Sequence, residues 1–285
     1  MMCAVSLGAA AQLPDYVPTD GLVAWYGFAG NGFDATGDAP EMLLIGSATF
    51  TADRFGTENN ALNPNGGSAN TNGPFFEYGW GDAFSVSIWF TRPLDTGGNA
   101  RLISTECPEG NFRIANDAPG QGIIAQMGSY MYVNPLSEAW YHLVYTYDGD
   151  ATKRVFLNGS LHSEKVEIGF EPQNFCNPLA LGRKASSSGS DLWPGDIDDV
   201  GIWDRGLTEE EILGLYNTAA PIFGCTDSDA CNYDDNADID DGSCLYTPQQ
   251  SLESTIQLSY ENNLAVAVPQ GLQSWTWSDG DNDCL

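Results

Sequence analysis

"PGDIDDVGIWDRGLTEEEI" (residues 194–212) combines a strand pattern, a helix start and a cluster of acids. In a strand, Asp198, Val200 and Ile202 share one face, so the two apolar residues predict a core-facing side. Thr208 stands three residues before Glu211, the spacing of a capping box at the start of a helix. The acids raise the question of whether they catalyse, bind a metal or merely complete the strand.

Four further stretches before residue 220 carry strand signals: residues 21–28, 83–92, 140–149 and 154–162. In the second stretch, every other residue is apolar (Phe84, Val86, Ile88 and Phe90), which predicts one buried face. In the fourth, Asn158-Gly159 favours the positive φ angles of a two-residue hairpin turn. Strands separated by such turns, with one helix, predict an antiparallel β-sandwich.

The composition limits the partners and the location of the protein. The chain has 39 acidic and 10 basic residues and a net charge of −29, which disfavours nucleic acid and anionic membranes as partners. No stretch approaches the roughly 20 apolar residues of a membrane helix, so membrane insertion is not expected. Residues 1–12 resemble the end of a secretory signal peptide, which predicts a secreted or cell-surface protein. Lys and Arg all precede Ile222, where we place a domain boundary.

Four motifs occur in an order that resembles a known family. They are "GLVAWYGFAGNGFDATG" (21–37), "FSVSIWF" (84–90), "WYHLVYTYDG" (140–149) and "GDIDDVGIWDRGLTEEEI" (195–212). Residues 20–218 thereby resemble the laminin-G-like, concanavalin-A-like jelly roll of bacterial exported and surface proteins. The resemblance implies an all-β fold: a two-sheet antiparallel jelly-roll sandwich with one short C-terminal helix, then a small disulfide-rich acidic segment.

The remainder of the chain contains two shorter segments. Residues 222–246 resemble a Cys/Asp-rich repeat of exported proteins from Bacteroidetes-type bacteria, on the motif "GCTDSDACNYDDNADIDDGSC" (224–244). Residues 250–285 resemble the start of a truncated immunoglobulin-like module. We therefore expect the chain to be part of a longer protein.

Six cysteines follow residue 12, and an even number in an exported protein indicates disulfides. Free thiols are the alternative. Cys107 and Cys176 are the cysteines of the jelly roll, so we predict that they pair. The four cysteines of the tail allow three connectivities; we favour Cys225–Cys244, because these two stand at the ends of the acidic motif.

No catalytic site is predicted. Laminarinase-type enzymes with a similar jelly roll carry two catalytic glutamates on one strand as E-x-D-x-x-E, and "DIDDVG" has neither. In a regular strand, Asp198 would stand at the rim of the core and Asp199 on the opposite face. His142 lies in an aromatic strand, where a packed histidine is expected rather than a general base.

Calcium is a candidate structural cofactor at two places, since it prefers carboxylate and carbonyl oxygens. The family resemblance implies that Asp34 and Asp198 could meet around a calcium ion. The alternative makes Asp34 a turn residue and Asp198 a hydrogen-bond acceptor. The second place is an alternating acidic run, for which a solvated turn is the alternative: Asp234, Asn236, Asp238 and Asp240.

A sugar platform needs exposed aromatic faces. Trp193, in a Ser/Gly-rich loop, is the leading candidate, with loop anchoring as its alternative; Tyr130, Tyr132 and Trp80 could join it. We therefore predict a non-catalytic exported or cell-surface module for binding or adhesion, with glycans or other surface ligands as partners. The alternatives are a sugar-binding accessory domain of a glycoside hydrolase and a structural spacer.

Overall fold

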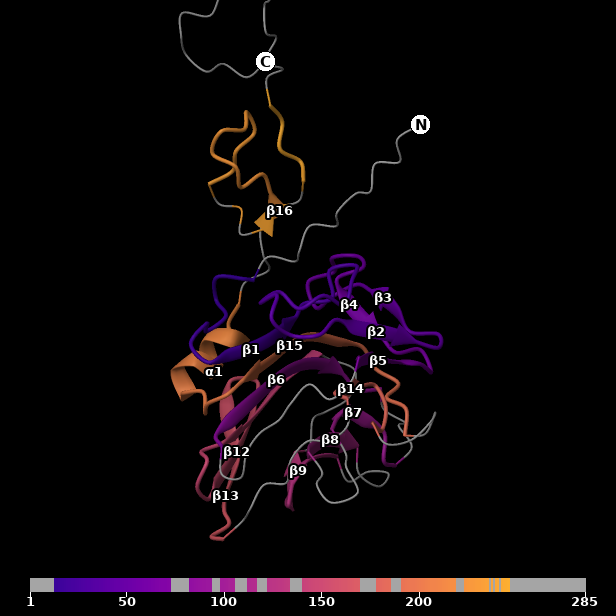
Figure 1. The fold of residues 1–285 in the computed structure, drawn as a ribbon, viewed down its shortest axis with the longest axis vertical. Coiled ribbons are helices and arrows are strands. Elements are labelled where there is room, and N and C mark those ends of the chain that lie inside the picture. The colour runs from indigo at the N-terminus through magenta and orange to yellow at the C-terminus, as the bar shows by residue number, and fades with distance from the viewer. Residues whose placement is uncertain are drawn as a thin grey trace, which may run out of the picture. The chain divides into compact units, whose positions relative to one another are not determined.

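The computed structural model describes residues 13–72, 82–93, 98–105, 112–116, 122–133, 140–169, 178–185, 191–218, 223–235, 237, 239–240 and 242–246. The chain forms two compact units, Met1–Ala220 and Pro221–Leu285 (Figure 1). The first consists of two antiparallel sheets and one short helix, which confirms the predicted jelly-roll sandwich. No helix among the described residues is long and apolar enough to cross a membrane.

Two sheets make up the jelly roll. The larger has the order β13 (Ser160–Val166), β12 (Thr152–Leu157), β11 (Trp140–Tyr147), β6 (Phe84–Thr91), β15 (Ile197–Trp203), β4 (Ala61–Asn63), β3 (Thr49–Thr51), with β1 (Leu22–Tyr26) pairing with β15. The smaller has the order β10 (Ser129–Val133), β9 (Ile123–Met127), β8 (Phe112–Asn116), β7 (Arg101–Ser104), β14 (Ala180–Leu181), β5 (Ser68–Thr71), β2 (Met42–Ile45). In the second unit, β16 (Phe223–Gly224) and β17 (Ile239–Asp240) pair in parallel.

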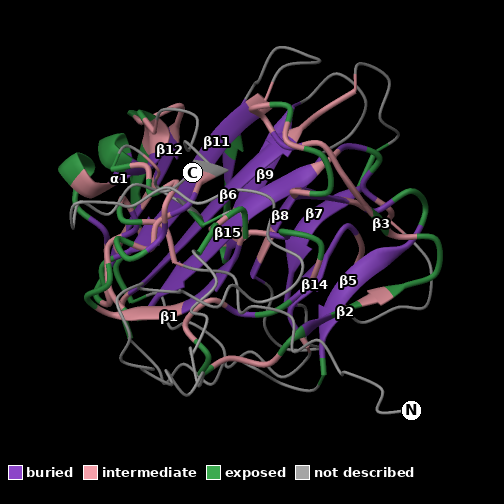
Figure 2. Ribbon diagram, turned by 90° about the horizontal axis from the view of Figure 1, so that it is seen from above, coloured by how far each residue is buried: buried purple, intermediate pink, exposed green. Residues whose placement is uncertain are grey.

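The main core lies between the two sheets, whose strands are mostly buried (Figure 2). The predicted alternation in β6 is confirmed, because all four of its apolar residues enter this core: Phe84, Val86, Ile88 and Phe90. From the smaller sheet, Ile103, Ile114, Ala125 and Met131 face them. Removing this apolar surface from water is the main stabilising contribution to such a sandwich.

A second apolar cluster covers the outer face of the eight-stranded sheet. Helix α1 (Glu209–Tyr216) follows β15 and buries Ile212 and Leu215 in this cluster. Residues 13–18, here called the N-terminal strap, add Val17 to it, and the carbonyl of Pro18 accepts a hydrogen bond from Trp203 Nε1 (2.7 Å). This face is therefore closed by the strap and the helix.

The two local predictions around α1 are confirmed. Thr208 and Glu211 form the capping box, since each side chain accepts from the backbone N–H of the other residue. Asn158 and Gly159 have φ angles of 50° and 74° in the turn between β12 and β13. A Cβ at Gly159 would lie about 3.0 Å from the Tyr216 ring, so the positive φ angle favours glycine there and a side chain would crowd α1.

Candidate functional site

The acids of "DIDDVG" lie at a β-bulge in β15. The pairing with β6 shifts register between Asp198 and Gly201, and Asp199 has a φ angle of 43°. Ile197 and Val200 both face the core, so the inserted residue directs Asp198 and Asp199 to the same, outer side. The prediction that these two acids lie on opposite faces is therefore wrong, because regular alternation does not anticipate a bulge.

Arg54 joins the two acids. Its Nη1 lies 2.9 Å from Asp198 Oδ2 and 2.7 Å from Asp199 Oδ2. Tyr16 of the strap donates a further hydrogen bond to Asp199 Oδ2 (3.1 Å). The Arg54 guanidinium also lies over the Trp89 ring, 4.5 Å from its centroid, which adds a cation–π contact. The acids thus belong to an internal ion cluster that ties β15 to the strap and to the loop before β4.

The pKa values of both acids in this cluster are raised. Burial raises the pKa of Asp198 well above its usual value, repulsion from Asp199 adds to the shift, and Arg54 opposes it. Burial likewise raises the pKa of Asp199, again against the attraction of Arg54. Since both carboxylates are buried and share one arginine, neither is placed to meet a substrate.

A second polar pair lies nearby, between Ser87 and His142. Ser87 Oγ is 2.8 Å from His142 Nε2, a distance at which a histidine can activate a hydroxyl nucleophile. Both residues are buried, and the Trp89 ring stacks on the imidazole at 5.0 Å between centroids. Burial, with a smaller contribution from Arg54, lowers the pKa of His142 to about 3. The prediction of a packed histidine agrees with this geometry.

Asp34 and Asp198 belong to separate networks. Asp34 Oδ1 accepts from the Trp25 N–H (2.8 Å) and Oδ2 from the Ala39 N–H (2.9 Å), so this carboxylate organises its own loop. Asp198 forms an ion pair with Arg54, so an arginine stands where the sequence predicted a calcium ion beside this carboxylate. Within the described part of the chain, no group of three or more His, Cys, Asp or Glu side chains could hold a metal ion.

Trp193 does not form a sugar platform, and that prediction is wrong. Its side chain is fully buried, and its Nε1 donates to the carbonyl of Thr91 (3.2 Å). The indole meets the Phe90 ring edge-on at 5.8 Å. A Ser/Gly-rich loop predicts surface exposure, but the large apolar area of tryptophan favours the core. The alternative of loop anchoring describes this residue.

Tyr130 and Tyr132 lie on the outer face of the seven-stranded sheet, as exposed rings on its edge strand β10. They are 47% and 48% exposed, and their ring centroids are 6.2 Å apart at an interplanar angle of 43°. Gln126 pairs with Tyr130 across the strands, and its Oε1 is buried without a hydrogen-bond partner. The Arg113 guanidinium lies 5.9 Å from the Tyr130 ring centroid. These four residues are called the shelf below.

Two of the shelf residues were not predicted from the sequence. Arg113 and Gln126 interrupt the apolar strands "FRIAN" and "IIAQM", and such an isolated polar residue was the only available signal. Trp80, the fourth predicted aromatic residue, lies outside the described residues, as do Cys107 and Cys176.

A buried lysine holds the hairpin that carries the shelf tyrosines. Lys153 Nζ, from the opposite sheet, donates to the carbonyl of Met127 (2.6 Å) and to Glu167 Oε2 (2.8 Å). Ser129 Oγ donates to the same Glu167 oxygen (2.6 Å). Because Met127 and Ser129 flank the turn between β9 and β10, this ion pair fixes the hairpin against the eight-stranded sheet.

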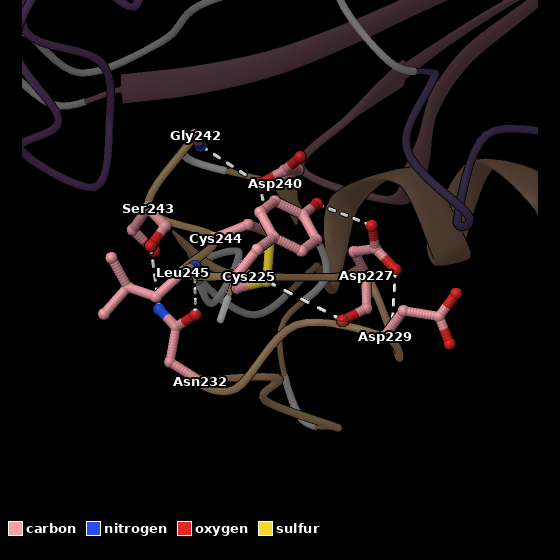
Figure 3. The surroundings of a disulfide bond; sticks show 10 residues. Cys225, Asp227, Asp229, Asn232, Asp240, Gly242, Ser243, Cys244 and Leu245 are labelled. Carbon is pink, nitrogen blue, oxygen red and sulfur yellow. Dashed lines mark hydrogen bonds between the residues drawn. A yellow bond between two sulfur atoms is a disulfide. The ribbon is translucent and has the colours of Figure 1, made fainter. Parts of the chain in front are cut away.

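The second unit contains the predicted Cys225–Cys244 disulfide, with Cα atoms 4.8 Å apart (Figure 3). Cys231 is disulfide-bonded as well. Of the predicted calcium ligands in this unit, Asp240 Oδ1 accepts from the Gly242 N–H (3.0 Å), and the Asp234 N–H donates to the carbonyl of Cys225 (2.9 Å). The other two, Asn236 and Asp238, lie outside the described residues. Calcium binding here stays a prediction.

The fold has known relatives. Residues 63–213, just over half of the chain, match a family model described as the Concanavalin A-like lectin/glucanases superfamily. Among solved structures, domain 4 of AbnA, a GH43 extracellular arabinanase from Geobacillus stearothermophilus in complex with arabinotriose, is 18% identical with a TM-score of 0.55; the match covers 69% of this chain and 98% of that one.

Two binding domains of toxins are also similar. The botulinum neurotoxin serotype D binding domain is 13% identical with a TM-score of 0.53, and that of Paraclostridial Mosquitocidal Protein 1 is 14% identical with a TM-score of 0.51. Each match covers 72% of this chain and 54% of the other, so this chain spans about half the length of those domains. At these identities the likeness concerns the fold alone. A comparison with curated proteins finds no match.

Proposed function

Because this chain belongs to the concanavalin A-like lectin/glucanases superfamily, we propose that its jelly roll is a non-catalytic module that binds glycans through the shelf. The observation that carries the proposal is the pair of exposed tyrosine rings on β10, with centroids 6.2 Å apart and the Arg113 guanidinium beside one of them. The apolar face of a sugar ring packs against an aromatic ring, and the phenolic hydroxyl of tyrosine can hydrogen-bond to a sugar hydroxyl.

The rest of the jelly roll supports a binding role rather than catalysis. Asp198 and Asp199 are buried and share Arg54, and the Ser87–His142 pair is covered by Trp89. One structural neighbour was solved with arabinotriose and others are binding domains of toxins, which supports a saccharide or a surface receptor as ligand. In our proposal the protein is exported or displayed on the cell surface, where such a module can serve adhesion.

A second candidate function is a sugar-binding accessory domain of a glycoside hydrolase. The likeness to domain 4 of an arabinanase favours it, because that domain is one part of a larger enzyme. In this case the catalytic module would belong to another part of a longer chain. A structural spacer is the third candidate, and it would make the shelf dispensable.

The test is a glycan array followed by titration calorimetry on the full chain. The double variant Tyr130→Ala/Tyr132→Ala should lose at least about tenfold in affinity for any glycan that the wild type binds, about 1.4 kcal/mol. Tyr233→Ala is the matched control, since Tyr233 is 48% exposed but lies in the second unit. Equal binding by wild type and double variant would refute the proposal, and sugar release that Asp198→Asn abolishes would refute its non-catalytic part.

A further inference from the structure

The seven-stranded sheet differs in charge from the rest of the chain. The whole chain has 39 acids and 10 bases, but none of the seven strands of this sheet contains an acid. Two of them contain a base, Arg101 in β7 and Arg113 in β8. At short range this sheet therefore attracts an anionic group, although the protein as a whole carries a net negative charge.

A further basic segment is attached to the same strands. Ser104 of β7 pairs with Arg113 of β8 across the sheet. The Ser104 Oγ donates to the carbonyl of Arg183 (3.1 Å) and accepts from the Ala185 N–H (2.9 Å). These two hydrogen bonds hold Arg183 and Lys184, which follow β14, beside β7. The segment is therefore one strand away from Arg113.

Arg183 lacks the acidic partner that other bases of the jelly roll have. It is partly exposed, and its side chain forms no ion pair with any residue that the structure describes. By contrast, Arg101 Nη2 lies 3.9 Å from Asp191, and Lys153 Nζ lies 2.8 Å from Glu167. The guanidinium of Arg183 thus keeps a fork of N–H donors that matches the geometry of a carboxylate.

Arg113 brings positive charge to the aromatic rings of the shelf. It is partly exposed, and its guanidinium lies 5.9 Å from the ring centroid of Tyr130, which is 47% exposed. A saccharide that packs against this ring would have its substituents within reach of the Arg113 donors. A carboxylate substituent would form charge-assisted hydrogen bonds there, which are about twice as strong as neutral ones.

We propose that the glycan recognised by the shelf carries carboxylate groups, as uronic acids do, and that Arg113 and Arg183 select these groups. This inference rests on the proposed glycan-binding function. The net charge of −29 opposes the approach of an anionic ligand. At physiological ionic strength, however, charges more than about 8 Å apart are largely screened, whereas a guanidinium and a carboxylate in contact are about 3 Å apart. The selection therefore acts in the bound complex.

The experiment compares matched ligands on the full chain at one ionic strength. The probes are oligogalacturonate and oligomannuronate, each titrated by calorimetry beside its carboxyl-reduced form, which has the same linkages without the charge. Wild type should bind the acidic form at least about tenfold more tightly than the reduced form. Arg113→Gln/Arg183→Gln should lose most of this preference.

Two further variants keep the test decisive. Arg183→Gln alone removes a side chain without an ion pair among the described residues, so it tests the inference even if the double variant does not fold; it should also reduce the preference. Arg154→Gln is the matched control, because Arg154 is a partly exposed arginine of the other sheet and pairs with Glu164. It should retain the full preference.

The outcomes separate this inference from the proposed function. A glycan that depends on Tyr130 and Tyr132 but binds equally well after carboxyl reduction overturns the carboxylate inference alone. A preference for the acidic form that the arginine variants retain overturns it as well. Binding that is absent, or unchanged in Tyr130→Ala/Tyr132→Ala, overturns the proposed function and this inference with it. Binding lost with the tyrosines, together with a preference lost with the arginines, supports both.

Discussion

Replacing Arg54 by methionine should destabilise the jelly roll strongly, because it leaves two buried carboxylates without their shared cation. The side chains of Arg54, Asp198 and Asp199 are 6%, 2% and 11% exposed. Removing one partner of a buried ion pair typically costs about 3–5 kcal/mol. Methionine keeps much of the length of the side chain and its packing on Trp89. The decrease in the free energy of unfolding therefore measures mainly the removal of the positive charge.

The measurement is urea unfolding of the full chain at pH 7, followed by tryptophan fluorescence. Arg154→Met is the matched control: Arg154 also pairs with an acid, Glu164, at 2.6 Å, but the two side chains are 37% and 44% exposed. Such surface pairs contribute about 0–1 kcal/mol. If Arg54→Met lowers the free energy of unfolding by no more than Arg154→Met does, the cluster does not stabilise the fold as described.

The pH dependence gives an independent check. The pKa values of Asp198 and Asp199 are raised in the folded state by burial, so the folded protein binds protons more tightly than the unfolded chain. Stability at these sites therefore increases as the pH falls from above the folded pKa values toward the ordinary value near 3.9. Without Arg54 this dependence should become steeper, and adding Asp198→Asn and Asp199→Asn should flatten it. If Arg54→Met lowers the free energy of unfolding by the same amount at pH 5 and at pH 7, the electrostatic explanation is contradicted.

Three further predictions concern other parts of the chain. Lys153→Met should lower the free energy of unfolding by about 2 kcal/mol, the contribution of hydrogen bonds to a charged group, and weaken glycan binding, since the shelf hairpin loses its anchor; unchanged calorimetry and melting would contradict it. Replacing Cys225 and Cys244 by serine should destabilise the second unit by about 3 kcal/mol, given a sequence separation of 19 residues, which proteolysis and mass mapping can detect. Removing calcium with a chelator should reduce hydrogen-exchange protection in residues 223–246 and leave the melting of the jelly roll unchanged; equal protection with and without calcium would oppose a calcium site in the tail.

The strands and the helix could be predicted from short stretches of sequence, whereas the candidate site depends on contacts between residues that are far apart in the sequence. The alternation in β6, the capping box at Thr208 and the Asn158-Gly159 turn each depend on a few neighbouring residues, and each is present in the structure. The β15 bulge depends on its register with β6, which no short stretch specifies. The partner of Asp198 is Arg54, 144 positions away in the sequence. For the same reason, Trp193 looked exposed in its loop, although the loop carries the indole into the core.

The two outer faces of the sandwich therefore differ in how far they are covered. On the eight-stranded sheet, the N-terminal strap and α1 close the surface over the ion cluster of Arg54, so the acids of "DIDDVG" serve the scaffold. On the seven-stranded sheet, the Tyr130 and Tyr132 rings of β10 are exposed, and Lys153 fixes the hairpin that carries them. Substitutions at the ion cluster should consequently change stability more than affinity. Substitutions at Tyr130 and Tyr132 should change affinity while stability stays nearly constant, since exposed side chains contribute little to the core.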